Sequence, residues 1–312
     1  MNTEIKNAVQ AAGQDAPYDR SAKRLLSNKH ILAYILVTLI SDFKGMPARE
    51  AEKYIEGDVY VNVVPLEPGL TNKAEKGDKI AGLNTEDGEV HEGIIRYDII
   101  FYVRLRDGLA QIIVNIEMQK DKPSEYKLLN RAIFYVCRLV SSQKERDFAN
   151  SNFDDIKRVY SVWICPYAKG NYIKHIHLTS EDILESCELE GNLDLLNIML
   201  VGLNDKVPEH DERYELHRLL STLLSEKLKP EEKLSIINKE YAIPVDQDIK
   251  EEVDKMYTLS QHIKDEGRNE RDIEYIVNMH RKGYTLEQIA DVSEKTMKEV
   301  ESILKDRKPL LA

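Results

Sequence analysis

Residues 93–120 read GIIRYDIIFYVRLRDGLAQIIVNIEMQK, and they decide the fold. Two long runs of β-branched and aromatic residues flank the tripeptide Arg106-Asp107-Gly108. An Asp-Gly pair between alternating apolar runs is the strongest short-range signal for a β-hairpin. If Asp107 and Gly108 form a two-residue turn, Arg106 faces Leu109, and the numbers of all paired residues sum to 215.

The side chains support this register. Successive side chains of a strand point to opposite faces, and one face then carries only apolar pairs: Tyr97 with Met118, Ile99 with Ile116, Phe101 with Val114, and Val103 with Ile112. The other face pairs Arg96 with Gln119, Asp98 with Glu117, and Ile100 with Asn115. A slip of one residue would set polar positions against apolar ones. Asp98 and Glu117 are therefore predicted to be direct neighbours, with Cβ atoms roughly 5 Å apart.

The flanking segments alternate between helical and strand patterns. Helical spacing predicts helices over residues 21–43, 48–55 and 124–148, while β-branched runs predict strands over 59–64 and 156–165. Residues 66–92 are rich in Gly, Asp, Glu and Asn and predict a loop with a short strand near 79–83. This order predicts an α/β fold, a mixed sheet flanked by helices, followed by a mainly helical C-terminal region.

The chain is predicted to be mostly helical from about residue 180, with a break near Gly267. We divide it into a flexible tail, a core, a helical region and a small C-terminal segment, over residues 1–20, 21–175, 176–266 and 267–312. The sequence pattern of the last segment is typical of a helix-turn-helix. Its second helix lacks the basic face of a DNA reader, which favours a small pair of packing helices.

Composition limits the classes of function. The 312 residues carry 44 Lys and Arg against 55 Asp and Glu, a net charge of −11, which excludes a globally basic nucleic-acid coat. The three cysteines lack CxxC spacing, and the N-terminus lacks the apolar core of a signal peptide. The longest apolar run, residues 31–40, is about half a membrane span. We expect a cytoplasmic protein without membrane contact.

Two adjacent carboxylates repel, so they share a proton or bind a cation. Asn115 and Gln119 add neutral oxygen donors on the same face, and such hard ligands suit Mg²⁺ rather than zinc. An Asp and a Glu on the solvent face of a hairpin are, however, also ordinary. The hairpin alone does not distinguish these alternatives.

A resemblance adds weight to the metal site. Segments 97–99 and 115–119, then 126–132, 135–139 and 157–165, together resemble the PD-(D/E)XK nuclease family transposases, which are related to recombination-promoting nucleases. Residues 25–29 and 31–33 add to the similarity, which covers roughly residues 20–170. The resemblance implies a restriction-endonuclease-like fold and metal-dependent hydrolysis of DNA in transposition or recombination.

The resemblance also implies roles for residues. Asp98 and Glu117 would be the acidic ligands of Mg²⁺, or of Mn²⁺ as a substitute, and the Met118 carbonyl would complete the protein's ligands. Gln119 stands where the motif usually has lysine. A neutral amide can orient water by hydrogen bonding but supplies no charge for the developing phosphorane.

Other cations could contact the substrate. Lys127 and Arg131 lie on the helix that packs beside the site in the resembled fold, and Arg96 could hold a phosphate or pair with an acid. All three also suit ordinary surface positions. An upstream acid often joins such sites, and three glutamates are available for that role: Glu50, Glu52 and Glu56.

Two other functions remain open at this point. A nuclease fold without the motif lysine could serve as a non-catalytic module that binds nucleic acid or protein, and an RNA-directed nuclease is a third option. Cutting both strands would suit a homodimer, although no heptad pattern supports one.

Overall fold

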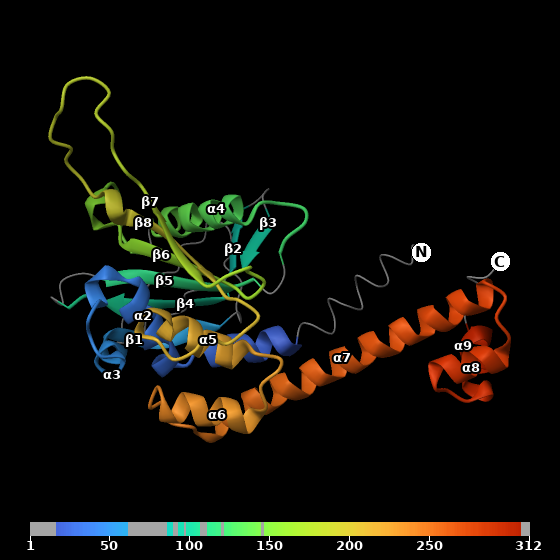
Figure 1. Cartoon of the computed structure of the whole chain (residues 1–312). Helices are drawn as coiled ribbons and strands as arrows, with labels where there is room; N and C mark the ends of the chain where they lie inside the picture. Colours follow the sequence, from blue (N-terminus) through green and yellow to red (C-terminus); the bar gives the residue numbers. More distant parts are fainter. Residues whose placement is uncertain are drawn as a thin grey trace. The chain divides into compact units, whose positions relative to one another are not determined.

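The computed structural model describes residues 17–61, 86–89, 93–96, 98–106, 111–119, 122–144 and 147–306 (Figure 1). A six-stranded sheet forms its centre, in the order β1-β4-β5-β6-β8-β7. The strands are β1 (Ile55–Val61), β4 (Ile99–Arg104), β5 (Gln111–Met118), β6 (Arg158–Cys165), β7 (Tyr172–His177) and β8 (Leu196–Gly202). β5, β6 and β8 run parallel, whereas β1, β4 and β7 pair antiparallel with their neighbours. The predicted α/β fold with a mixed sheet and flanking helices is confirmed.

The predicted hairpin register is confirmed between β4 and β5. The ladder pairs Ile99 with Ile116 and continues to Arg104 with Gln111, so every pair sums to 215. Asp107 and Gly108, the predicted turn, lie outside the described residues, as do Tyr97 and the predicted loop and short strand between residues 66 and 85.

The ladder is shorter than the sequence predicted. Arg96 does not pair with Gln119, because it belongs to a separate two-stranded sheet of β2 (Glu86–Glu89) and β3 (Gly93–Arg96), where its partner in register is Glu86. The chain therefore leaves the small sheet and enters the large one close to Asp98.

Helices cover both faces of the large sheet. Figure 1 shows α4 (Leu128–Ser141) on one face and α2 (Lys29–Leu39) and α5 (Glu215–Leu224) on the other. The side facing α4 holds an apolar cluster that includes Ile100, Trp163 and, from the helix, Val136. The face that carries Asp98 and Glu117 is thus covered rather than open to solvent. Neither acid lies on a solvent face of the hairpin, since each is buried.

The N-terminal helical region is broken once. Residues 17–26 form a first helix, so the predicted tail over 1–20 includes its beginning. Asn28 then starts α2, because its Oδ1 accepts a hydrogen bond from the backbone N–H of His30 at 3.0 Å. The predicted second helix is shorter than expected, with α3 (Ala48–Ala51) followed by a 3₁₀ turn at Glu52–Tyr54.

Strands β7 and β8 extend the sheet beyond the predicted core. β8 falls in the region predicted to be helical, and its continuous apolar sequence LNIMLVG is ambiguous between a buried helix and a buried strand. The connection between β7 and β8 contains Ile183 and Leu184, whose side chains are 90% and 94% exposed.

The predicted break near Gly267 is wrong. Helix α6 (Pro230–Lys239) is followed by α7 (Gln247–Arg281), a single 35-residue helix that passes through Gly267. A glycine inside a helix costs only about 1 kcal/mol relative to alanine, which a long helix tolerates.

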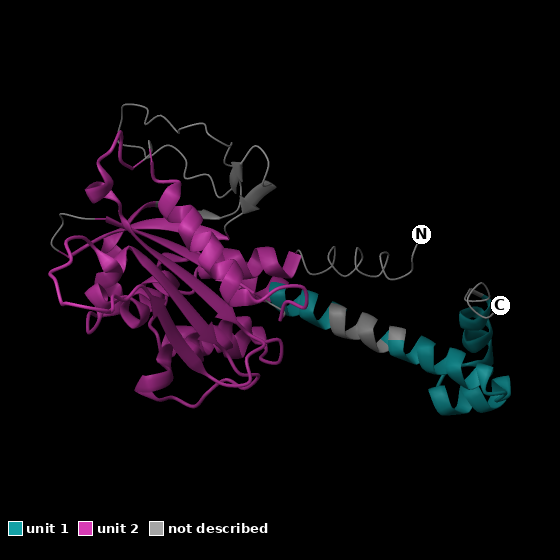
Figure 2. Cartoon of the chain, turned by 90° about the horizontal axis from the view of Figure 1, so that it is seen from above, with its two compact units in different colours: residues 1–14, 256–312 teal, residues 15–255 magenta. Residues whose placement is uncertain are grey.

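The chain divides into two compact units, residues 15–255 and residues 256–312 together with 1–14 (Figure 2). In the second unit, α8 (Leu286–Ser293) and α9 (Met297–Asp306) pack with the end of α7 around Ile276, Ile289 and Val300. The predicted pair of packing helices is therefore present. Across the described ranges, we find no helix with enough length and apolar character to span a bilayer.

Candidate active site

Asp98 and Glu117 lie side by side where β4 begins and β5 ends. The backbone N–H of Asp98 donates a hydrogen bond to Glu117 Oε1 at 3.1 Å, and the N–H of Met118 donates to Asp98 Oδ2 at 3.0 Å. Only 9% of Asp98 and 3% of Glu117 is exposed. The sequence thus predicted the juxtaposition of the two carboxylates, but not their burial.

A lysine of the first helix forms an ion pair with Asp98. Lys23 Nζ lies 2.6 Å from Asp98 Oδ1 and 2.5 Å from Asp19 Oδ2, one helical turn earlier. Both sides of the Lys23–Asp98 ion pair are only 12% exposed. Lys23 and Asp19 were not among the predicted site residues, and Asp19 lies in the segment that was expected to be a flexible tail. The Asp-x-x-x-Lys spacing, which suits one helix face, was the available signal.

The three upstream glutamates lie elsewhere. Glu50 is exposed on α3, and Glu52 binds His30 Nδ1 at 2.7 Å. Glu56 contacts Arg104 and Gln111 on the neighbouring strands. The acid that joins the site from the N-terminal region is therefore Asp19.

The pKa values of the acids reflect their burial. Burial raises the pKa of Glu117 well above its usual range, and the Asp98 carboxylate raises it further. Burial also raises the pKa of Asp98, although the Lys23 ammonium opposes that rise. Burial alone would lower the pKa of Lys23, but Asp98 and Asp19 outweigh it and raise the pKa. Lys23 therefore stays charged, while Glu117 holds its proton to higher pH than an exposed glutamate does.

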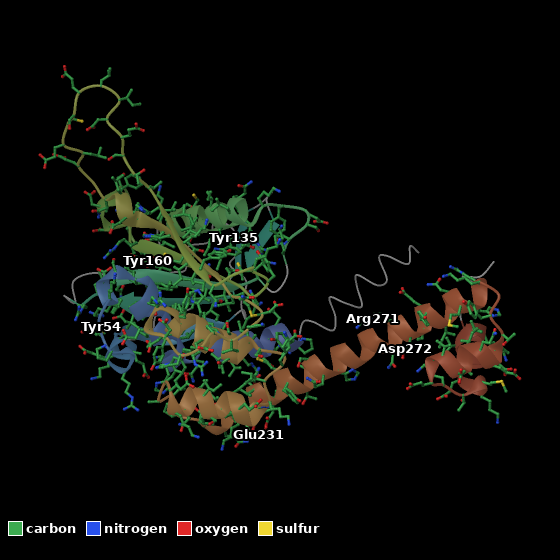
Figure 3. The ribbon with its side chains drawn as sticks, in the orientation of Figure 1. Tyr54, Tyr135, Tyr160, Glu231, Arg271 and Asp272 are labelled. Carbon is green, nitrogen blue, oxygen red and sulfur yellow. The ribbon has the colours of Figure 1, made fainter. Side chains whose placement is uncertain are left out.

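Arg131 borders the site from α4. Its Nη1 donates to Gln119 Oε1 at 3.4 Å, and its two Nη atoms donate to the hydroxyls of Tyr126 and Tyr135 at 2.6 and 2.9 Å. The guanidinium also lies 4.9 Å from the ring centroid of Tyr135 and 5.6 Å from that of Trp163. Figure 3 shows Tyr135 on α4 beside the sheet, where its ring meets Trp163 of β6 at 5.5 Å. These contacts fix the guanidinium beside Gln119.

The other two predicted cations do not converge in the same way. Lys127 is exposed just before α4 begins, and the side chain of Arg96 lies outside what the structure describes. Of the three candidates, only Arg131 has a contact with a predicted catalytic residue among the described side chains.

Asn115 adds an unsatisfied oxygen beside the acids. It lies two residues before Glu117 on the same strand face, is fully buried, and its Nδ2 donates to Ser161 Oγ at 3.3 Å. Its Oδ1 has no hydrogen-bond partner. A buried polar atom without a partner is costly unless a water, an ion or another polar group satisfies it.

The donor set fits a hard divalent cation. The Asp98 and Glu117 carboxylates lie together, and the Met118 carbonyl points to the same side of β5 as the Met118 N–H, which faces Asp98. Oxygen donors of this kind suit Mg²⁺. Within the described part of the chain, no three or more His, Cys, Asp or Glu side chains gather as a metal-binding group. Any ion would therefore take few protein ligands and retain water, as Mg²⁺ usually does.

No protein-family model, curated protein or solved structure matches this chain. The resemblance to PD-(D/E)XK nucleases therefore rests on the sequence segments alone.

Proposed function

We propose that the protein is a metal-dependent endonuclease that hydrolyses DNA phosphodiester bonds. The activity would belong to its sheet-containing unit and would serve transposition or recombination. The observation that carries the proposal is the buried contact of Asp98 with Glu117, bordered by Lys23 and Arg131. Two acids with raised pKa values and two fixed cations at one edge of a sheet are typical of a catalytic site.

Asp98, Glu117 and the Met118 carbonyl would hold the ion. When bound, Mg²⁺ supplies polarisation of a phosphoryl oxygen and a lower pKa for a coordinated water. Glu117 must release its proton to act as a ligand, so cation binding and proton release are coupled.

Lys23 supplies the positive charge that Gln119 lacks. Its ammonium is held near Asp98 by Asp19, and it can stabilise negative charge that develops on the phosphate. The Gln119 amide orients water by hydrogen bonding. Arg131 presents a planar fork of donors suited to two phosphate oxygens, and its tyrosine contacts hold that fork in place.

DNA is the proposed partner and the cytoplasm the proposed compartment. The local cations would offset the acidic character of the whole chain where the backbone of DNA approaches.

The test is plasmid nicking with and without Mg²⁺, on the wild type and on Glu117→Gln. We expect nicking that requires Mg²⁺ and that falls at least about 100-fold in the variant, because the amide is a poor ligand and carries no charge. Asp194→Asn is the matched control, since Asp194 pairs with Arg158 elsewhere on the sheet. Wild-type activity in Glu117→Gln would refute the assignment.

A second candidate is a non-catalytic binding module. The neutral Gln119 and the 3% exposure of Glu117 favour it. Calorimetry separates the candidates, because the module predicts no heat of Mg²⁺ or Mn²⁺ binding that depends on Glu117. Single-stranded RNA in the cleavage assay tests the RNA-directed alternative.

A further inference from the structure

A cavity of about 300 Å³ lies at the carboxyl ends of the parallel strands. Its lining includes Met118 at the end of β5, Tyr167 just after β6, and Leu203 just after β8. In open α/β sheets, ligands bind outside the carboxyl ends of the strands. Tyr18 of the first helix and Ser221 of α5 also line it.

The cavity adjoins the candidate active site. Met118 lines the cavity, and its N–H donates to Asp98. Tyr18 also lines it and directly precedes Asp19, the partner of Lys23. A group in the cavity would therefore lie next to a phosphodiester held by the acids.

A buried hydroxyl in the lining lacks a partner. Ser221 is 6% exposed, and its Oγ makes no hydrogen bond. That Oγ is inaccessible to solvent, so an occupant of the cavity does not reach the Ser221 hydroxyl. The Tyr18 hydroxyl, by contrast, donates to the Leu224 carbonyl at 2.9 Å, which fixes its ring at the wall.

Charge in the lining favours a neutral occupant. Asp205 and Glu226 contribute carboxylates, and Lys227 contributes one ammonium. A phosphate would be repelled by the two acids, whereas a flat, neutral, polar group would not. The volume lies at the low end for small-molecule pockets, roughly 300–1,000 Å³, and suits one base rather than a base pair.

We propose that this cavity takes a single unpaired nucleobase of the strand to be cut, with Tyr18 and Tyr167 as the aromatic residues of its lining. The inference rests on the proposed nuclease function and specifies its substrate as DNA with an unpaired nucleotide next to the scissile bond. Enzymes that extrude a base hold it between aromatic or apolar side chains and read its polar edge.

The test compares a short fluorescein-labelled duplex that contains one unpaired thymine with the same duplex fully paired. Affinity is measured by fluorescence anisotropy without divalent ions, so that binding is read independently of cleavage. We expect the wild type to bind the unpaired substrate on the order of 10-fold tighter, the effect of stacking one base. Tyr167→Ala should remove most of that difference.

Two variants serve as controls. Tyr167→Phe keeps the ring and should keep the preference, and Tyr275→Ala removes a tyrosine that is 59% exposed in the other unit. Equal affinity of the wild type for both duplexes would overturn the inference, as would an unchanged preference in Tyr167→Ala.

The nicking assay separates this inference from the proposed function. Mg²⁺-dependent nicking without a preference for the unpaired substrate refutes the cavity assignment alone. A preference that depends on Tyr167, in a protein that cuts nothing, supports base binding and refutes hydrolysis.

Discussion

The amino and carboxyl ends of the parallel strands differ in how their charged side chains are paired and exposed. At the amino end of β6, Arg158 binds Asp42 at 3.1 Å and Asp194 at 2.9 Å, and Asp194 is 54% exposed. At the carboxyl end of β5, Asp98 and Glu117 contact each other in the interior, and Lys23 binds only the first of them. The amino end joins opposite charges near solvent, whereas the carboxyl end buries two neighbouring acids of which only Asp98 is paired with Lys23.

This difference separates an ordinary ion-pair network from a candidate active site. Partly exposed pairs contribute little and can be placed almost anywhere on a surface. A buried pair of like charges is costly and persists where it serves a purpose other than stability. We expect the two ends to differ in energy and in activity as they do in geometry.

The largest expected effect is on stability, in Lys23→Met. This change removes the ammonium from between two acids and should lower the free energy of unfolding by about 3 kcal/mol, since breaking a buried ion pair leaves an uncompensated charge. Arg158→Met, at the amino end, should cost only about 1 kcal/mol. Urea unfolding at neutral pH measures both, and equal losses would mean that the two ends are energetically alike.

The next effect is on catalysis, in Arg131→Lys. Lysine keeps the charge but loses the planar fork and the stacking on Tyr135 and Trp163. We expect kcat/KM for DNA cleavage to fall about 10-fold, equivalent to about 1.4 kcal/mol. Arg218→Lys is the matched control, because Arg218 pairs with Glu240 away from the acids. Unchanged kinetics in Arg131→Lys would remove Arg131 from the substrate site.

The smallest effect is a gain in stability for Glu117→Gln. Since the folded-state pKa of Glu117 is raised, the folded protein holds a proton that the unfolded chain has released above the ordinary pKa of glutamate. Wild-type stability therefore falls as pH rises through the interval between those two pKa values. The amide of Glu117→Gln does not titrate, so this fall in stability with rising pH is absent in the variant. We therefore expect its Tm at neutral pH to be higher by about 3 °C, or about 1 kcal/mol.

Thermal melts over a pH series check the sign. Wild type and variant should converge at acidic pH, where Glu117 is protonated in both the folded and the unfolded state. A variant that is less stable at every pH would show that the carboxylate is stabilising and would contradict the raised pKa.

Local chemistry made the hairpin predictable. The Asp-Gly signal and the pairing of apolar with apolar residues from Ile99 to Ile116 specify one register, and that register places Asp98 beside Glu117. The burial of the pair was not predictable from the hairpin, because the helix that covers that face follows in sequence and packs through tertiary contacts.

Other features depended on long-range contacts. Lys23 meets Asp98 across 75 positions of sequence, and no local pattern joins them. β8 has no alternation because it lies between two neighbouring strands and is largely buried, so periodicity cannot identify it. Arg131, by contrast, followed from its place on the helix that packs beside the site in the resembled fold, although its partners did not.

The dispersed origin of the site has a consequence for synthesis of the protein. Lys23 is translated long before Asp98, the residue whose carboxylate it neutralises. The two side chains meet only when the first helix docks on a finished hairpin. A ribosome-bound fragment that ends before β5 would carry Lys23 but neither Glu117 nor the Met118 carbonyl. Under the proposed function, a host cell would thus be exposed to a DNA-cutting enzyme only after the polypeptide has completed its core.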